Sequence, residues 1–419
     1  MTRPHLLVLG NSGAALAAVR AYRAHGGRAR VSMVSPEPCP AYSPVLTTYY
    51  LREKVGEEAL YLCTDADYSA LDVDCRFGAA AREVDADART VALSDGSKLG
   101  YDQLLIATGA SPRRLGGELD PDAAAEVCYL RTLADARRIR ERAAGAAHVV
   151  VLGAGLVSLQ VATALARSDR RVTCVVSSQQ LLSQNIDAEA AGLLRAHVER
   201  SADIEFVFGA DVVSLAKGGD GFRLVLSSGA ELTAGLVVAG KGIEPNLGFV
   251  DRSQLRVDRG LIVDRTMRTS RRDVYAAGDV CECRNRVTRR REPVTNWIDA
   301  CEQGLVAGAN LAGHEVTTPG SVAENVTTLF GLPVASIGMT RPDDTEGLKQ
   351  LTRRDERRGL YRSLFLRDGR VVGAVLLGDI GGAGVLRSVI VGGTDVGRPP
   401  EELLAQPARY ADAVRRLAV

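Results

Sequence analysis

The chain has 419 residues, which is too long for one hydrophobic core and suits two or three domains. Hydrophobic residues make up 46% of it and charged residues 25%, as in ordinary globular proteins. The net charge of +1 excludes a general nucleic-acid or membrane-surface role, because either needs a basic excess. No charged and apolar leader precedes the first strand-like run, and later apolar runs are short. We therefore expect a cytoplasmic protein without membrane-spanning segments.

The first predicted unit is a buried strand over residues 5–9, a tight turn and an Ala-rich helix. This arrangement places a pyrophosphate at a helix amino terminus. The turn departs from the G-x-G-x-x-G pattern, because Ser12 and Ala15 replace its second and third glycines. A strand over residues 30–34 follows, and Glu37 lies where an acid binds the two hydroxyls of an adenosine ribose. The predicted nucleotide-binding residues here are Gly10, Ser12, Gly13, Ala14 and Glu37.

The same unit recurs from residue 148. A strand over 148–152 leads into a second glycine turn and a helix, and a strand over 171–176 follows. Two such units in register indicate duplication of a supersecondary element. Ser177 stands where the ribose-binding acid would be, so a 2′-phosphate is tolerated, and the choice between NADH and NADPH stays open. The predicted binding residues of this second turn are Gly153, Gly155, Leu156, Ser158 and Ser177.

Three further segments resemble motifs of the pyridine nucleotide–flavin reductases. Residues 101–112 resemble the A-T-G-x-x-P crossover, residues 236–246 resemble its echo after the NAD(P)H domain, and residues 274–280 resemble the second FAD motif. In that last motif the Asp accepts a hydrogen bond from the ribityl chain of FAD. The resemblance implies further cofactor-binding residues: Ala81, Ala107, Thr108, Gly109, Gly242, Gly278 and Asp279.

The resemblance covers nearly the whole chain and implies its architecture. We expect an α/β fold with two Rossmann-like nucleotide-binding domains, one for FAD and one for NAD(P)H, and an α+β carboxy-terminal interface domain. The expected boundaries are 1–112 and 248–320 for FAD, 113–247 for NAD(P)H and 321–419 for the interface domain. Within the last domain, residues 361–379 alternate apolar and polar side chains around an Asp-Gly turn, which predicts a β-hairpin.

The branch that the chain most resembles holds rubredoxin and ferredoxin reductases, the flavin portion of assimilatory nitrite reductase, and flavin subunits of iron–sulfur 2-oxoacid dehydrogenases. The resemblance implies an enzyme that passes electrons from NAD(P)H through FAD to a ferredoxin, a rubredoxin or an iron–sulfur subunit. Two alternatives stay open: a stand-alone oxidase or small-molecule reductase, and a non-catalytic flavin subunit or nicotinamide sensor. A homodimer is one outcome for the interface domain, and the acceptor is not identified.

The eight cysteines include no C-x-x-C, and the C-x-x-x-x-C of the disulfide reductases is absent. Cys39 is interpreted as a loop thiol, with a redox role as the alternative. Cys281 and Cys283 are interpreted as incidental thiols, because a full metal site needs about four ligands and only Cys301 and His314 are near in sequence. We therefore expect no metal.

Residues 291–304 resemble the segment that presents a helix amino terminus to the flavin ring, and such a terminus stabilises a reduced, anionic flavin. In some ferredoxin reductases a Trp lies there beside the isoalloxazine, so Trp297 is the candidate catalytic residue; a Trp that fills the domain seam is the alternative. Just before this segment, Arg284–Arg291 carries five arginines. We interpret this run as a solvated turn or, alternatively, as a docking patch for an acidic iron–sulfur protein.

Overall fold

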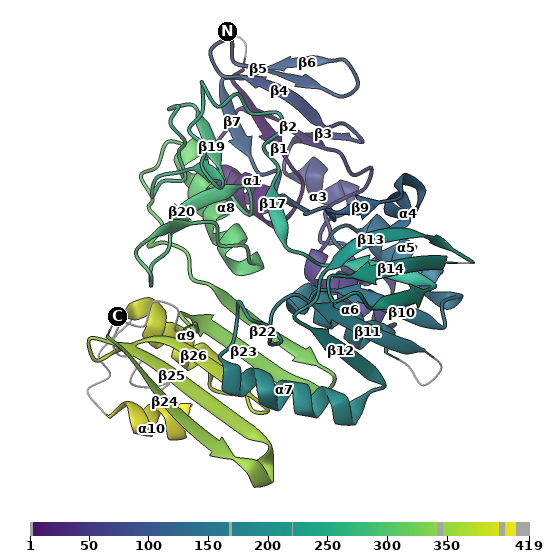
Figure 1. Cartoon of the computed structure of the whole chain (residues 1–419). Helices are drawn as coiled ribbons and strands as arrows, with labels where there is room; N and C mark the ends of the chain where they lie inside the picture. The colour runs from purple at the N-terminus through teal and green to yellow at the C-terminus, as the bar shows by residue number, and fades with distance from the viewer. Residues whose placement is uncertain (1–2, 167–169, 220, 342–346, 394–398, 408–419) are drawn as a thin grey trace. The chain divides into compact units, whose positions relative to one another are not determined.

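The computed structural model describes residues 3–166, 170–219, 221–341, 347–393 and 399–407 (Figure 1). Contacts group the chain into two compact units, each made of segments far apart in sequence. Unit 1 comprises Met1–Val45, Gly56–Ser111 and Ile243–Val322, and unit 2 comprises Leu46–Val55, Pro112–Gly242 and Ala323–Val419. The three-domain division stays a prediction, and the last residues of its interface domain, 408–419, lie outside the described part.

Unit 1 is organised around a five-stranded parallel sheet in the order β19 (Val274–Ala276), β7 (Gln103–Ile106), β1 (His5–Leu9), β2 (Arg30–Ser35) and β3 (Val73–Phe77). Its central strands are continuous apolar runs because helices and loops cover both faces. Helices α1 and α8 pack against each other at very short range. A methyl group added at Gly304 would lie 2.2 Å from the Ala14 carbonyl oxygen, and one at Gly308 would lie 2.1 Å from that of Ala18. Only glycine allows this approach of the two helices.

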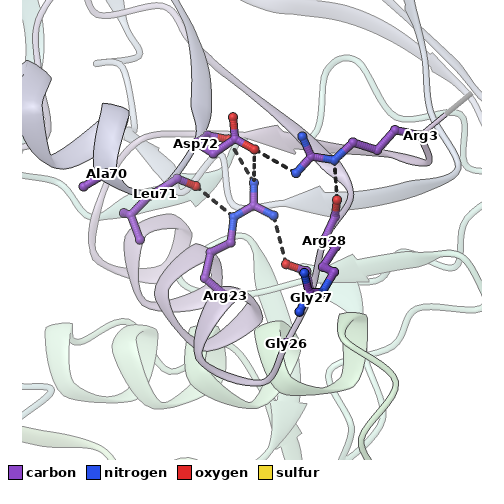
Figure 2. A pocket seen from close by; sticks show the side chains of 8 residues that line it. All are labelled: Arg3, Arg23, Gly26, Gly27, Arg28, Ala70, Leu71 and Asp72. Atoms are coloured by element: carbon purple, nitrogen blue, oxygen red, sulfur yellow. Dashed lines mark hydrogen bonds and ion pairs between the residues drawn. The ribbon is translucent and has the colours of Figure 1, made fainter.

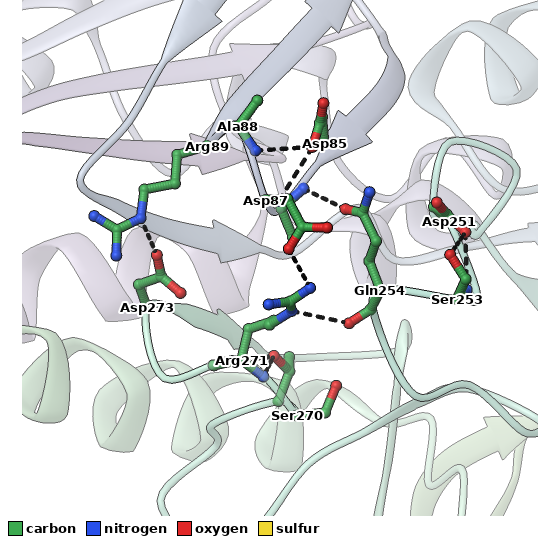
Figure 3. A network of polar contacts seen from close by, with 12 residues as sticks. Asp85, Asp87, Ala88, Arg89, Asp251, Ser253, Gln254, Ser270, Arg271 and Asp273 are labelled. Carbon is green, nitrogen blue, oxygen red and sulfur yellow. Dashed lines mark hydrogen bonds and ion pairs between the residues drawn. The ribbon is translucent and has the colours of Figure 1, made fainter.

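Smaller antiparallel elements surround this sheet, and a polar network fastens the β4–β5 turn to residues 251–273 (Figure 3). Arg89 pairs with Asp273 at 2.6 Å, and Arg271 pairs with Asp87 at 2.5 Å. The elements of unit 1 are β1 (His5–Leu9), α1 (Gly13–Ala24), β2 (Arg30–Ser35), α3 (Asp65–Ala70), β3 (Val73–Phe77), β4 (Ala81–Asp85), β5 (Thr90–Leu93), β6 (Lys98–Gly100), β7 (Gln103–Ile106), β8 (Ala110–Pro112), β17 (Ile243–Pro245), β18 (Leu261–Ile262), β19 (Val274–Ala276), β20 (Cys281–Arg284), β21 (Arg291–Glu292) and α8 (Trp297–Leu311).

Unit 2 contains a second parallel sheet, in the order β12-β11-β10-β16, which repeats the first strand–helix–strand unit. This confirms the duplication predicted from the sequence. A mixed sheet, β15-β14-β13-β9, accompanies it, in which only β9 pairs in parallel, with β13. The elements are α2 (Thr47–Leu51), β9 (Glu118–Leu119), α4 (Pro121–Glu126), α5 (Leu133–Ala144), β10 (His148–Leu152), α6 (Leu156–Leu165), β11 (Arg171–Val176), α7 (Ala188–Ser201), β12 (Ile204–Phe208), β13 (Val212–Gly218), β14 (Gly221–Leu226), β15 (Glu231–Ala234) and β16 (Leu236–Ala239).

The carboxy-terminal part of unit 2 is a five-stranded antiparallel sheet in the order β22-β23-β26-β25-β24. The predicted hairpin is confirmed as β25 and β26, joined through Asp368 and Gly369 with φ of 52° and 75°. Two positive φ values are typical of a type I′ turn, whose twist matches that of the strands. The elements are β22 (Glu324–Leu329), β23 (Leu332–Gly338), β24 (Leu348–Asp355), β25 (Leu360–Arg367), β26 (Arg370–Leu377), α9 (Ala383–Gly392) and α10 (Pro400–Ala405).

None of the helices in the described ranges is long and apolar enough to span a bilayer.

Candidate functional site

The first glycine turn in unit 1 joins β1 to α1. Gly10 has a φ of 118°, and a Cβ there would lie 2.1 Å from the Ala107 carbonyl oxygen, so only glycine fits. Ser12 is the N-cap of α1 in an extended conformation, and its side chain makes no capping hydrogen bond. The N–H groups of the first helical turn lack intrahelical acceptors and therefore suit an anion such as a pyrophosphate.

The segment after β7 lies beside this turn and is held by Asn246. The Asn246 side-chain amide donates to the Thr108 carbonyl oxygen at 2.8 Å, and its backbone N–H donates to the Gly109 carbonyl oxygen at 3.0 Å. Gly278, with a φ of 85°, approaches the turn from β19, and a Cβ there would lie 3.2 Å from that of Ala14. The structure thus brings together the predicted residues of three separate motifs.

A tyrosine network surrounds the end of β2, where Glu37 lies. The Tyr42 hydroxyl donates to the Glu37 carboxylate at 2.5 Å, and the Tyr68 hydroxyl donates to the Asn11 side-chain oxygen at 2.7 Å. The Asn11 amide donates in turn to the Cys39 carbonyl oxygen at 3.3 Å, so this network places Cys39 near the adenosine end of the predicted FAD site. Burial raises the pKa of Tyr68 to about 12, which keeps its hydroxyl protonated as a donor.

The turn at Gly278 and Asp279 is held by a buried glutamine. The Gln303 side-chain oxygen accepts the Gly278 N–H at 2.8 Å, and its amide donates to the Ser321 hydroxyl at 3.1 Å. Cys283 lies 2.9 Å from that hydroxyl, and burial raises the pKa of its thiol. Cys281 is also buried, and desolvation raises its pKa well above the ordinary value. Both thiols therefore pack in the core, and within the described residues no group of three or more His, Cys, Asp or Glu could hold a metal.

Trp297 is the first residue of α8, and Asn296 caps this helix by accepting the Asp299 N–H at 2.8 Å. The half-buried indole lies against the first glycine turn, because a Cβ at Gly13 would be 2.8 Å from the ring. The same Cβ would be 3.0 Å from the Cys301 sulfur. The structure therefore places Trp297 beside the predicted FAD finger within unit 1, and its role next to the isoalloxazine stays a prediction.

Ala81 lies apart from the finger residues, at the start of β4 in the three-stranded antiparallel sheet. Just before it, the Ala79 N–H donates to the Ser35 carbonyl oxygen at 3.0 Å, near the carboxyl end of β2. Ala81 therefore lies near the carboxyl end of β2, where Glu37 also lies, and not at the pyrophosphate turn.

These residues of unit 1 fit FAD. The exposed N–H groups of α1 suit its pyrophosphate, and the carboxylate of Glu37 suits the adenosine ribose. Asp279, the expected acceptor for the ribityl chain, directly follows Gly278, which packs tightly beside Ala14.

The second glycine turn in unit 2 repeats the first. Gly153 has a φ of 113°, and a Cβ there would lie 2.5 Å from the Gly240 carbonyl oxygen. The Ser158 hydroxyl donates to that same oxygen at 3.2 Å, so this departure from the glycine pattern joins α6 to the end of β16. Gly155 caps α6, and a Cβ there would meet nothing within 4 Å. The open space at this helix terminus fits a dinucleotide pyrophosphate.

Ser177 and Gly242 frame this second finger. Ser177 is exposed directly after β11, where the ribose of a dinucleotide is expected. Gly242 has a φ of 93°, and its carbonyl oxygen accepts the Arg113 N–H at 3.0 Å. The residues from Ser177 to Gln180 carry no carboxylate, so nothing in that segment repels a 2′-phosphate.

Unit 1 also has a surface pocket at the edge of its sheet opposite the nucleotide-binding turns (Figure 2). We interpret this pocket as structural and not as a ligand site. Arg3, Arg28 and Asp72 each lie one or two residues before the start of a strand, whereas nucleotides bind at the carboxyl ends. The Arg23 guanidinium there donates to the carbonyl oxygens of Leu71 at 2.8 Å and Asp72 at 2.9 Å. Its donors therefore serve the backbone.

Four site residues were missed from the sequence: Asn11, Tyr42, Tyr68 and Gln303. Asn11 and Gln303 lie inside segments already singled out, and Tyr42 lies five residues after Glu37. The side-chain amides of the first two and the hydroxyl of Tyr42 were the available signal. Tyr68 in α3 contacts Asn11, which lies 57 positions earlier in the chain, and no local sequence pattern predicts that contact.

The chain matches two family models. The pyridine nucleotide-disulphide oxidoreductase model covers residues 4–304, and the rubredoxin NAD+ reductase C-terminal domain covers residues 325–394.

Individual relatives match over most of the chain. It is 32% identical over 407 residues to the NADH-dependent phenylglyoxylate dehydrogenase subunit epsilon of Aromatoleum evansii, covering 96% of this chain and 94% of that one. It is 30% identical over 320 residues to a rubredoxin-NAD(+) reductase of Pseudomonas putida, covering 75% of this chain and 81% of that one. Among solved structures, the covalent putidaredoxin reductase–putidaredoxin complex matches with a TM-score of 0.88 at 24% identity, over 99% of this chain and 100% of that one. This last likeness shows the fold.

Proposed function

This chain belongs to the pyridine nucleotide-disulphide oxidoreductase family, and from that premise we propose that it passes electrons to an iron–sulfur protein. It is an NAD(P)H-dependent flavoprotein oxidoreductase that uses FAD. When bound, FAD would supply two-electron acceptance from NAD(P)H and one-electron release, which suits a one-electron acceptor.

The observation that carries this proposal is that both family models match one chain. The match to the rubredoxin NAD+ reductase C-terminal domain follows the nucleotide-binding match and covers most of the antiparallel sheet β22-β23-β26-β25-β24. Relatives named as rubredoxin and ferredoxin reductases support the same acceptor class.

We assign roles to the residues as follows. In unit 1 the first turn of α1 binds the FAD pyrophosphate, Glu37 accepts the ribose hydroxyls and Asp279 accepts the ribityl hydroxyl. The amino terminus of α8, with Trp297, stabilises negative charge on the flavin through its N–H groups. In unit 2 the first turn of α6 binds the dinucleotide pyrophosphate.

The basic loop Arg284–Arg291 is the proposed docking patch. It is a tight turn between β20 and β21, because the buried Asn285 side-chain oxygen accepts the N–H groups of Val287 at 2.8 Å and Thr288 at 3.0 Å. Arg284, Arg289 and Arg291 are exposed on this preorganised turn. Fixed positive charge of this kind steers and orients an acidic partner.

The test is NAD(P)H-dependent reduction of a [2Fe–2S] ferredoxin and of a rubredoxin, with oxygen uptake measured in parallel. The proposal predicts reduction of at least one acceptor faster than reduction of oxygen. Changing Arg284, Arg289 and Arg291 to Gln should raise the acceptor KM about 3- to 30-fold at low salt, with a smaller effect at high salt.

Arg353 is exposed near the end of β24, and Arg357 and Arg358 are exposed on the β24–β25 turn, so the matched control changes these three arginines to Gln. Equal effects of the two triple variants would contradict docking at Arg284–Arg291. Acceptors that are reduced no faster than oxygen would contradict the proposed function itself.

A second candidate rests on the full-length similarity to a subunit of a larger dehydrogenase. In that case the acceptor is an iron–sulfur subunit of the same complex. Copurification of the tagged chain from its native host distinguishes the two, because a stable stoichiometric complex favours the subunit role and a lone chain favours a diffusing acceptor.

We place the protein in the cytoplasm, because all eight cysteines are free thiols and a reducing compartment maintains that state.

A further inference from the structure

The loop after β11, residues 177–187, carries Ser177 at the proposed ribose site and runs back to the second glycine finger. The Leu182 N–H donates to the Ala154 carbonyl oxygen, inside that finger, at 2.9 Å. Leu182 has a φ of 49°, a left-handed conformation that is costly for a branched side chain. A loop that holds this conformation needs anchors elsewhere.

The carboxy-terminal sheet supplies those anchors within unit 2. The Thr340 hydroxyl donates to the Asn185 carbonyl oxygen at 2.7 Å, and the Arg341 guanidinium donates to the Gln184 side-chain oxygen. Thr340 lies two residues after the end of β23, so the backbone of this loop is tied to the end of a sheet strand.

The strongest anchor is the buried pair of Tyr361 and Asp187. The Tyr361 hydroxyl donates to the Asp187 carboxylate at 2.8 Å, and the two residues are only 1% and 6% exposed. The same carboxylate oxygen caps α7 by accepting the Ala190 N–H at 3.0 Å. The other oxygen, Asp187 Oδ2, is buried with no hydrogen-bond partner among the described residues.

This arrangement costs stability, since a buried, unsatisfied carboxylate oxygen is unfavourable. A fully apolar contact would hold the sheet against α7 at lower cost. The hydrogen bond from Tyr361 to the Asp187 carboxylate instead fixes the direction in which the loop enters α7.

We propose that Thr340 and Tyr361 are positioning residues for NAD(P)H: the carboxy-terminal sheet holds loop 177–187 in the conformation that receives the adenosine ribose. The inference rests on the proposed dinucleotide site of unit 2 and not on the identity of the electron acceptor. Neither residue contacts the glycine finger, and both act through the loop.

The test compares wild-type holoenzyme with Tyr361→Phe. Binding of NAD+ and NADP+ is measured by calorimetry, and flavin reduction by NADH and NADPH is followed anaerobically as a function of concentration. The expected result is a rise of about three- to tenfold in the Kd of the dinucleotide, the range for partial loss of one hydrogen bond to a carboxylate. The limiting rate of flavin reduction and the FAD content should stay unchanged.

Ser363→Ala is the matched control. Ser363 lies two residues along β25, is fully buried, and accepts the Gln350 amide at 2.9 Å. Its loss removes a buried hydrogen bond from the same sheet without touching the loop, so its dinucleotide Kd should equal that of the wild type. Equal Kd increases in Tyr361→Phe and Ser363→Ala would overturn the inference, as would an unchanged Kd in Tyr361→Phe.

Two more variants extend the test, and the first keeps it decisive if Tyr361→Phe does not fold. Thr340→Ala removes a single hydroxyl and should raise the Kd in the same direction; an unchanged Kd would overturn the inference. In Asp187→Asn combined with Tyr361→Phe, the two effects on Kd should be non-additive because they break one contact, and full additivity would contradict the route through Asp187. Normal dinucleotide binding without reduction of any iron–sulfur acceptor would overturn the proposed function alone.

Discussion

The side chains of the two glycine turns determine how closely backbone and dinucleotide approach. In the second finger, Ser158 stands in the third glycine position, and its hydroxyl binds the Gly240 carbonyl oxygen. In the first finger, Gly13 is the glycine that faces Trp297 and Cys301, and Ser12 caps the helix without a side-chain hydrogen bond. At Ser158, this departure from the glycine pattern therefore adds a hydrogen bond where a glycine would allow only close packing.

Ser158→Ala tests the first of these substitutions. It removes one hydrogen bond and leaves the Gly240 carbonyl oxygen without the Ser158 donor. The loss of one such bond lowers the stability of the finger conformation by about 0.5–1.5 kcal/mol. We expect the Kd for NAD(P)H to rise about three- to tenfold. Thr163→Ala is the control, because the Thr163 hydroxyl binds the Leu159 carbonyl oxygen on the same helix, away from the finger. A larger effect from the control would refute this role of Ser158.

Gly13→Ala tests the contact with Trp297. The new Cβ would lie 2.8 Å from the indole and must displace it, an overpacking that typically costs about 1–3 kcal/mol. We expect FAD affinity to fall about tenfold, measured from the fluorescence of released flavin. Gly155→Ala provides the contrast, because its Cβ meets no protein atom within 4 Å. That variant should keep FAD and lose affinity for NAD(P)H.

At the scale of elements, the packing of α1 on α8 connects the FAD finger to the helix that carries Trp297. Gly304→Ala would place a Cβ 2.2 Å from the Ala14 carbonyl oxygen and push the helices apart. We expect a loss of about 1–3 kcal/mol in the free energy of unfolding, measured with denaturant. Gly192→Ala in α7 is the control: its Cβ meets nothing within 4 Å, so it should gain about 0.5–1 kcal/mol from helix propensity. Stabilisation by both substitutions would contradict the tight packing.

His5, the first residue of β1, should make the free energy of unfolding depend on pH. The pKa of His5 is lowered from 6.5, chiefly because burial disfavours the charged ring, and the Arg30 guanidinium lowers it further. The unfolded chain therefore binds a proton more readily than the native one. The stability that neutral His5 contributes is complete above pH 6.5 and is lost as the pH falls through the lowered pKa.

Denaturant unfolding at pH 7.5 and pH 5.5 checks this prediction. The wild type should lose more stability on acidification than His5→Gln, which keeps hydrogen-bonding groups near Ser32 and Gly100 but does not titrate. An equal loss in the two proteins would show that His5 does not contribute.

At the scale of the whole molecule, the sequence predicted what depends on local pattern. The duplicated strand–turn–helix and the Asp368-Gly369 hairpin follow from glycine spacing and alternation, and the structure confirms them. The helix amino terminus that the family resemblance implied within residues 291–304 is the start of α8 at Trp297. The contacts that join distant segments could not be read this way. Tyr68 to Asn11 and Tyr361 to Asp187 depend on the tertiary path of the chain, because the two contacts join residues 57 and 174 positions apart.

The central claim is that this flavoprotein takes a hydride from NAD(P)H and reserves the electrons for an iron–sulfur partner. The most direct test is anaerobic stopped-flow reduction of the purified yellow protein by NADH and by NADPH. In separate second experiments, the reduced protein is mixed with air-saturated buffer or with an oxidised ferredoxin, and reoxidation of the flavin is followed. We expect rapid bleaching by at least one dinucleotide, slow reoxidation by air and faster reoxidation by the ferredoxin. No bleaching by either dinucleotide, or reoxidation by air as fast as by the ferredoxin, would contradict it.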